Sequence, residues 1–191
     1  MKLIFATHNQ HKLEEIQQLI TPSVELMSLN DLGFLEEIEE TGKDLNENAL
    51  IKVQSVFQKF QINTFADDTG LEIDSLNGDP GVYSARYAGD EKNSLANMQK
   101  VLTLMKGQLN RKARFRTVIA LIFNQQEFLF EGVVNGEILE DPIGANGFGY
   151  DPIFKPEGFN LSFAQMDAAT KNSISHRGRA VEKLIQFISC H

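Results

Sequence analysis

The chain has 191 residues, of which 42% are hydrophobic and 23% are charged. That composition is typical of a globular protein large enough to bury a core without disulfides or structural metals. The formal net charge of -8 argues against sequence-independent binding of nucleic acid, which needs many Lys and Arg contacts to phosphates. The apolar run at the N-terminus is too short for a signal-peptide core or a membrane span, and a single cysteine, Cys190, cannot form an intrachain disulfide. We therefore expect a cytoplasmic protein that binds neither membranes nor nucleic acid.

Hydrophobic periodicity and capping residues predict that strands and helices alternate along the chain. Asn9 and Asp44 are residues of the kind that cap helices, and each precedes apolar residues at helical spacing. Glu47, three residues after Asp44, could complete a capping box. The fold class is therefore mixed α/β, with a mixed sheet flanked by helices. The predicted strands cover residues 2–6, 24–29, 63–66, 71–74, 114–123 and 127–134, and the predicted helices cover residues 10–20, 44–60, 93–105 and 176–189.

The stretch FADDTG, at residues 65–70, is the most informative single segment. Asp67 and Asp68 follow an apolar run, and we expect them at the end of a strand, where a sheet presents side chains to a crevice. Two carboxylates there can bind a divalent cation, and can orient or deprotonate a water molecule. A solvated Asp-Asp turn is the alternative, because Asp and Gly are common turn residues.

The segment from Thr7 to Lys12 is a candidate phosphate site. It joins the first predicted strand to the first predicted helix, and the free backbone N–H groups of a helix start attract anions. A Lys in the first turn adds positive charge. The segment lacks the glycines of a Walker P-loop, and an ordinary helix cap with a surface Lys is the alternative.

Residues 35–42 contain four glutamates, among them Glu40. In a long helix they would resemble the E-E-x-x-E metal site of all-helical nucleotide pyrophosphatases. Gly33 and Gly42 leave little room for such a helix. One acid of this run could instead join the Asp pair around a cation, because Mg²⁺ often uses one or two carboxylates together with substrate phosphates.

A glycine-rich loop at residues 144–149 leads into a candidate base-binding segment. Phe148 and Tyr150 offer ring faces on which a base could stack, and Asp151 could accept hydrogen bonds from ring N–H groups. A loop with buried aromatic residues is the alternative.

Residues 171–178 form a further polar cluster, in which Lys171 precedes the pair His176-Arg177. These side chains could bind phosphate or carbonyl oxygens, although a capped amphipathic helix is the alternative. The chain has no His/Cys cluster with zinc spacing, so a transition-metal site is not expected.

Together these motifs closely resemble the inosine/xanthosine triphosphate pyrophosphatase family, which removes non-standard purine nucleotides. The matching blocks run in the family's order over nearly the whole chain. They are T-x-N-x-x-K at 7–12, E-T-G at 40–42, E-N-A at 47–49, A-D-D-T-G-L at 66–71, P-G-V-Y-S-A-R-Y at 80–87, G-F-G-Y-D-P-I-F at 147–154 and S-H-R-G at 175–178.

The resemblance implies a single nucleoside-triphosphate pyrophosphatase domain over residues 1–191, with two lobes around a long curved sheet and a nucleotide cleft between them. It implies a homodimer that hydrolyses ITP, dITP and XTP to the monophosphate and pyrophosphate with Mg²⁺, and so keeps these nucleotides out of DNA and RNA.

The resemblance also assigns residues. Asp68 would accept a proton from the attacking water, and Glu40 and Asp68 would hold Mg²⁺. Thr69 stands where the family more often has Ser, and its hydroxyl would contact the substrate. The triphosphate would lie along Thr7, His8, Asn9, Gln10, His11 and Lys12, and the base would lie among Phe148, Gly149, Tyr150, Asp151, Lys171, His176 and Arg177.

Two other functions remain open at this point. A nucleotide sensor could keep the cleft and lose catalysis, although the intact Glu40, Asp67, Asp68 and Lys12 speak against it. A phosphatase with an Asp nucleophile fits less well, because Asp67 and Asp68 are adjacent instead of being separated by one residue.

Overall fold

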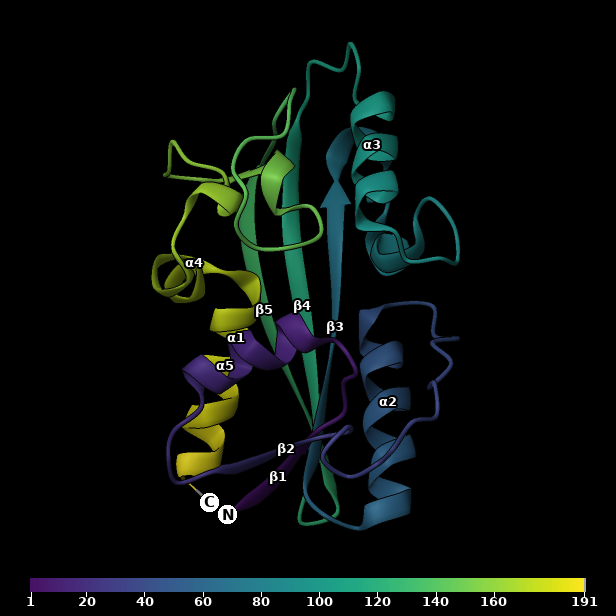
Figure 1. Cartoon of the computed structure of the whole chain (residues 1–191), viewed down its shortest axis with the longest axis vertical. Helices are drawn as coiled ribbons and strands as arrows, with labels where there is room; N and C mark the ends of the chain where they lie inside the picture. Colours follow the sequence, from purple (N-terminus) through teal and green to yellow (C-terminus); the bar gives the residue numbers. More distant parts are fainter. Residues whose placement is uncertain (191) are drawn as a thin grey trace. The chain divides into compact units, whose positions relative to one another are not determined.

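The computed structural model describes residues 1–190 and contains one mixed sheet with helices beside it (Figure 1). The six strands follow the order β2-β1-β3-β4-β5-β6, in which β1 is parallel to β2 and β3, and β5 is antiparallel to β6. The predicted fold class is confirmed. Within residues 1–190, no helix is long and apolar enough to span a membrane.

The strands are β1 (Lys2–Phe5), β2 (Glu25–Ser28), β3 (Thr64–Ile73), β4 (Lys112–Phe123), β5 (Gln126–Ile138) and β6 (Phe154–Pro156). The α-helices are α1 (Gln10–Leu19), α2 (Leu45–Phe60), α3 (Ser94–Leu104), α4 (Ala168–Ile174) and α5 (His176–Ser189), and the 3₁₀ helices are η1 (Asp74–Leu76), η2 (Gly81–Arg86), η3 (Asp151–Ile153) and η4 (Phe163–Gln165).

The predicted helix caps set the starts of the first two helices. Asn9 Oδ1 accepts a hydrogen bond from the Lys12 N–H at 3.1 Å, and Asp44 Oδ1 accepts one from the Glu47 N–H at 2.9 Å. The Glu47 carboxylate reaches back to the Lys43 N–H at 2.8 Å, one residue before the cap. The reciprocal bond expected of a capping box is therefore displaced by one residue.

β3 runs without a break through the acidic pair, so the prediction of two short strands with Asp67 and Asp68 at a strand end is wrong. Both carboxylates are buried and have basic or amide partners, which allows the backbone to stay extended instead of turning towards water. The glycine of this motif has a steric role. A Cβ on Gly70 would lie 2.6 Å from the Gly81 carbonyl oxygen, so only glycine allows this approach.

β4 and β5 form the predicted hairpin, with both strands longer than expected. Asn124 and Gln125 have φ values of 50° and 66°, the left-handed conformation that a two-residue hairpin turn requires at both positions. α4, β6 and the 3₁₀ helices were not predicted, because each is at most seven residues long and too short to show a period.

The chain divides into two compact units. The first contains Met1–Asp68, Thr117–Gly132 and the chain from Arg177 onward, and the second contains Thr69–Arg116 and Val133–His176. The predictions of one domain over residues 1–191 and of a cleft between two lobes stay predictions.

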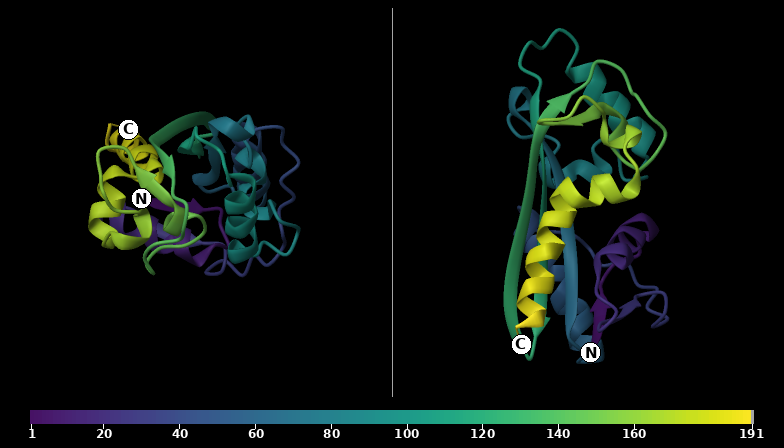
Figure 2. Two further views of the ribbon diagram at one scale, coloured as in Figure 1. Left: turned by 90° about the horizontal axis from the view of Figure 1, so that it is seen from above. Right: turned by 90° about the vertical axis from the view of Figure 1, so that its left-hand side faces the viewer.

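The first unit has a core made by α1, α5 and three strands. Leu13 and Ile16 of α1 pack with Phe65 of β3 and with Val181 and Leu184 of α5. Figures 1 and 2 show α5 and α2 on opposite sides of the strands of this unit. The strands are therefore covered by helices on both faces.

The second unit has its own core. It brings Met98 and Val101 of α3, and Met105 directly after that helix, together with Phe154 of β6 and Phe163 of η4. The predicted base-binding segment lies directly before β6. Because β6 packs into this core, the core holds the end of that segment in place.

The Asp44 cap gives a stability prediction, because it begins the helix that carries two residues of the site described below. Asp44→Ala removes the acceptor for the Glu47 N–H and is expected to lower the free energy of unfolding by about 1 kcal/mol. Asp44→Asn keeps an acceptor and should stay close to wild type. Urea unfolding of the three proteins measures this, and equal losses for both variants would show that the cap bond is not what matters.

Candidate active site

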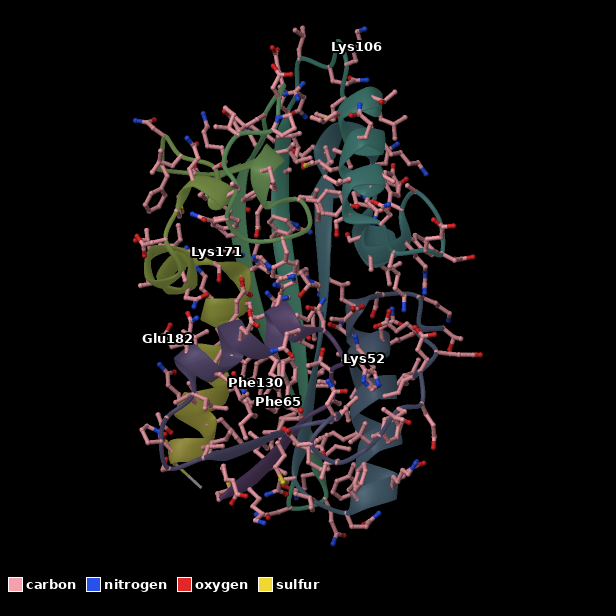
Figure 3. All side chains as sticks on the ribbon, viewed as in Figure 1. Lys52, Phe65, Lys106, Phe130, Lys171 and Glu182 are labelled. Carbon is pink, nitrogen blue, oxygen red and sulfur yellow. The ribbon has the colours of Figure 1, made fainter. Side chains whose placement is uncertain are left out.

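The adjacent residues Asp67 and Asp68 of β3 point to opposite faces of the strand. Successive side chains on a strand point to opposite faces, so Phe65 and Asp67 share one face and Ala66 and Asp68 share the other. Phe65 packs with α1 and α5, and Asp67 likewise meets residues of these two helices. Asp68 meets Asn48 and Lys52 of α2. Figure 3 labels Lys52 on that helix. Adjacent carboxylates therefore belong to two different ionic clusters.

The first cluster surrounds Asp67, whose side chain is 1% exposed. Its Oδ1 accepts a hydrogen bond from Lys12 Nζ at 2.9 Å, and its Oδ2 accepts bonds from Arg177 Nε and Nη2, each at 3.2 Å. Arg177 Nη1 also donates to the Glu15 carboxylate. Burial alone would raise the pKa of Asp67, but Lys12 and Arg177 outweigh burial and hold that pKa well below its usual range. Asp67 is thus a fixed anion.

The second cluster surrounds Asp68. Lys52 Nζ donates to Glu40 Oε1 at 2.6 Å and to Asp68 Oδ1 at 3.3 Å. Asn48 Nδ2 donates to Asp68 Oδ2 at 3.2 Å, and Asn48 Oδ1 accepts from the Gly42 N–H at 2.7 Å. The Asn48 carboxamide thereby ties Asp68 to the segment that carries Glu40.

The pKa of Asp68 moves in the opposite direction from that of Asp67. Burial raises the pKa of the Asp68 carboxyl, although Lys52 and Lys12 oppose the shift. Burial alone would lower the pKa of Lys52, but Asp68 and Glu40 outweigh burial and raise it. Of the two carboxylates, Asp68 is therefore the better proton acceptor.

Glu40 and Asp68 fit a divalent cation of the kind that prefers oxygen ligands. Both carboxylates lie within hydrogen-bond distance of one ammonium, so they converge on a single positive charge. Two carboxylates and one Lys leave one negative charge in excess, which suits Mg²⁺ with phosphate oxygens completing its shell. Among residues 1–190, no group of three or more His, Cys, Asp or Glu side chains is arranged for a metal ion. A cation bound here would therefore depend on the substrate for further ligands.

The predicted phosphate segment is the exposed beginning of α1. Of its side chains, the structure brings Lys12 to the acidic pair. The Thr7 hydroxyl accepts a hydrogen bond from the Asn9 N–H at 3.1 Å, and His8 Nε2 lies 3.1 Å from the Glu36 carbonyl oxygen. Gln10 Nε2 donates to Glu14 Oε1 at 3.2 Å, and His11 Nδ1 lies 4.0 Å from Glu14 Oε2.

In the second unit, Asp151 organises the predicted base-binding segment. Its Oδ2 accepts from the Phe148 N–H at 2.8 Å and from Lys171 Nζ at 2.7 Å. Lys171 Nζ lies 5.0 Å from the centre of the Phe148 ring. A Cβ on Gly147, where φ is 73°, would collide with the Asp151 carboxylate, so glycine is required there.

Tyr150 and His176 are parts of the aromatic core of this unit. The Tyr150 hydroxyl donates to the Ser84 carbonyl oxygen at 2.8 Å, and burial raises the pKa of Tyr150 far above its usual value. The His176 ring stacks on Phe115, with ring centres 4.6 Å apart. Gly149 and Thr69 are half-buried in the same unit, whereas Arg177 belongs to the Asp67 cluster of the first unit.

Sequence reasoning missed three residues of these clusters, namely Glu15, Asn48 and Lys52. Asn48 and Lys52 lie four residues apart on α2, so they share one helix face with the buried Leu45 and Val56. Polar residues at apolar positions of an amphipathic helix were therefore a usable signal. Glu15 gave no such signal, because its partner Arg177 lies 162 residues away in the sequence.

Comparison with known proteins places the chain in a family of nucleotide-handling α/β proteins. The model of the Ham1 family matches residues 3–187, and the chain belongs to that family. It is 53% identical to the dITP/XTP pyrophosphatase of Christiangramia forsetii, over 99% of this chain and 100% of that protein. It is 48% identical to the dITP/XTP pyrophosphatase of Flavobacterium johnsoniae, over 99% of this chain and 98% of that protein.

Solved structures agree with this assignment. The Ham1 protein of Staphylococcus aureus has a TM-score of 0.90 and is 36% identical, covering 99% of this chain and 98% of its own. A HAM1 protein of Coxiella burnetii has a TM-score of 0.91 and is 37% identical, with both chains fully covered. The resemblance inferred from the motifs is confirmed.

The lowered pKa of Asp67 predicts how stability depends on pH. Asp67 has a usual pKa of 3.8, and a carboxyl whose pKa is lowered by folding adds stability above that value and loses it as the pH falls below it. Asp67→Asn should lower the free energy of unfolding by about 3 kcal/mol at pH 6, because Lys12 and Arg177 lose a buried counter-ion.

The difference in the free energy of unfolding between wild type and Asp67→Asn should become smaller as the pH falls from about 4 to about 2.5. Urea unfolding at a series of pH values measures it. Glu137→Gln, which removes an exposed ion pair with Lys155, is the matched control and should cost less than about 0.5 kcal/mol. A difference for Asp67→Asn that stays constant down to pH 2.5 would contradict the assignment of Asp67 as a fixed anion.

Proposed function

We propose that this protein hydrolyses non-standard purine nucleoside triphosphates, namely dITP, ITP and XTP, to the monophosphate and pyrophosphate. The observation that carries the proposal is the pair of ionic clusters on opposite faces of β3, in a chain about half identical over its full length to dITP/XTP pyrophosphatases. One cluster offers a cation for phosphate and the other a carboxylate for water. Removal of these nucleotides would keep them out of DNA and RNA.

Asp68 is proposed as the proton acceptor for the attacking water. Burial raises the pKa of Asp68 above that of an exposed Asp and so brings it closer to neutral pH, which favours proton transfer. Asn48 donates a hydrogen bond to one oxygen of Asp68, so the orientation of the Asp68 carboxylate is fixed before substrate binds. Glu40 and Asp68 would hold Mg²⁺, which supplies positive charge beside the leaving pyrophosphate.

Lys12 and the N-terminus of α1 are proposed to bind the triphosphate. The backbone N–H groups of the first turn and the adjacent ammonium are both attractive to phosphate oxygens. Thr7, His8, Asn9, Gln10 and His11 line the exposed approach to this turn and would contribute polar contacts, as would the hydroxyl of Thr69.

The cluster around Asp151 is proposed to recognise the base. Phe148 offers a ring for stacking, and Lys171, held by Asp151, offers a donor for the O6 atom of a 6-oxo purine. Adenine presents an amino group at that position, which cannot accept a hydrogen bond from Lys171, and this would disfavour ATP. Tyr150 would hold the glycine-rich loop in place without contacting the base itself. Gly149, His176 and Arg177 would lie around the nucleotide.

We also propose that the protein is a cytoplasmic homodimer that does not bind nucleic acid. Large apolar side chains that remain exposed, such as Tyr83 at 56% and Leu95 at 73%, are the kind of surface that a partner subunit covers. Sedimentation of the purified protein at several concentrations tests the dimer, and a monomer throughout would exclude it.

A substrate panel tests the proposed activity. With Mg²⁺ present, dITP, ITP and XTP should release pyrophosphate and the monophosphate, at values of kcat/KM roughly 100-fold or more above those for ATP and GTP. Removal of Mg²⁺ with EDTA should abolish turnover. Equal turnover of ATP would contradict the specificity, and release of orthophosphate with a diphosphate would contradict the bond that is cleaved.

Asp68→Asn is the matched inactive variant. It should lower kcat by roughly 1,000-fold or more while ITP binding stays measurable, because the amide keeps the shape of the side chain but cannot accept the proton. Activity close to wild type in this variant would remove Asp68 from the mechanism. Tight ITP binding by the wild type without turnover would favour a nucleotide sensor instead.

A further inference from the structure

We propose that Asp67 is a positioning residue for polyphosphate binding, and that its buried carboxylate holds the Lys12 ammonium in the place where a phosphate group of the ligand meets it. This proposal rests on the proposed function for the identity of the substrate. It adds a residue that the reaction described above does not use.

Asp67 joins three elements through its two oxygens. Oδ1 holds Lys12 from the first turn of α1, and Oδ2 holds Arg177 from the start of α5, 110 residues further along the chain. Because each oxygen has a different cation, the carboxylate plane cannot rotate without breaking one of the contacts. The position of Lys12 is therefore tied to that of Arg177.

Arg177 is the anchor of this arrangement. Its side chain is 3% exposed and is held by Asp67 on one side and by Glu15 on the other. Glu15 lies three residues after Lys12 on α1, so the contacts form a closed circuit from α1 to α5, then to β3, and back to α1. A closed circuit of buried ions resists displacement of any one member.

Lys12 is the cation of the circuit that a ligand can reach. Its side chain is 16% exposed, against 1% for Asp67 and 3% for Arg177. A Lys side chain has a flexible stem of four carbons, and it loses much rotamer freedom when a ligand fixes its ammonium. Asp67 fixes the ammonium beforehand, so binding of phosphate does not have to bear that entropy loss.

The alternation of β3 separates this role from the chemical step. Asp67 faces α1 and α5, whereas Asp68, the proposed proton acceptor, faces α2. Loss of the Asp67 charge is therefore expected to weaken binding of the polyphosphate and to leave the proton transfer largely intact.

The experiment compares Asp67→Asn with wild type in steady-state hydrolysis of ITP. The KM should rise roughly 10- to 100-fold, the range for loss of a hydrogen bond to a charged group, while kcat changes less than about threefold. The matched control Glu137→Gln should leave both constants unchanged. A fall in kcat of tenfold or more with KM unchanged would overturn the proposal, because Asp67 would then act in the chemical step.

A double-mutant cycle with Lys12→Met tests whether Asp67 acts through Lys12. In the Lys12→Met background, Asp67→Asn should raise KM less than about twofold further, because the side chain that it positions is already gone. Independent, multiplicative effects of the two substitutions would overturn the proposal.

Binding of inorganic pyrophosphate, measured by calorimetry, provides a readout that needs no turnover. Pyrophosphate should bind Asp67→Asn roughly tenfold or more weakly than wild type, and equal affinities would overturn the proposal whether or not ITP is a substrate. Absence of ITP hydrolysis by the wild type would instead count against the proposed function alone.

If Asp67→Asn does not fold, Asp67→Glu keeps the charge but displaces it by one methylene. It should then show a raised KM and weakened pyrophosphate binding, with kcat near that of wild type. Wild-type values for both KM and pyrophosphate affinity in Asp67→Glu would overturn the requirement for a fixed position.

Discussion

Two buried carboxylates on consecutive residues of one strand can coexist only if each has its own cation. β3 meets this constraint through the alternation of its side chains, which sends Asp67 to α1 and α5 and Asp68 to α2. In a helix, consecutive side chains diverge by only about 100°, so the two charges would lie closer together and repel more strongly. The helices on the two faces of the first unit therefore also set the charges around β3. The helices on each face supply the basic residues that pair with the carboxylate on that face.

The two clusters perform different physical tasks because their charges balance differently. Around Asp67, two cations and two carboxylates cancel, and the pKa of Asp67 is lowered, so this cluster is rigid and unreactive. Around Asp68, two carboxylates share Lys52, and burial raises the pKa of Asp68, so this cluster attracts cations and protons. A single dipeptide thus contains one carboxylate whose pKa is lowered and one whose pKa is raised. The motif resemblance singles out Asp68, but the sequence does not show that the two carboxylates have different ionic partners.

Much of this could be predicted from the sequence, and what could not has physical reasons. The caps at Asn9 and Asp44 are local, and the helices that they begin were predicted within a residue or two. The acidic pair was recognised but was expected at a strand end, because its partners Lys12, Asn48, Lys52 and Arg177 are distant in the sequence. The polar positions on α2 mark two of these partners, but no local pattern shows that they meet the acidic pair. The roles of Asn48, Lys52 and Glu15 depend on the same long-range packing. The motif resemblance supplied the family and the expected role of Asp68, whereas the separate ionic partners of Asp67 and Asp68 required the fold.

The long sequence separation between Asp67 and Arg177 has a consequence for the nascent chain. β3 carries the carboxylates Asp67, Asp68 and Glu72 between its apolar residues, and during synthesis Arg177 emerges from the ribosome more than 100 residues after Asp67. Until then the exposed aspartates act as gatekeepers, because charge within an apolar strand opposes intermolecular β-pairing. Asp67, which holds Lys12 in the finished protein, would thus help to protect the unfinished chain from aggregation, and that protection ends when α5 docks and Arg177 pairs with Asp67.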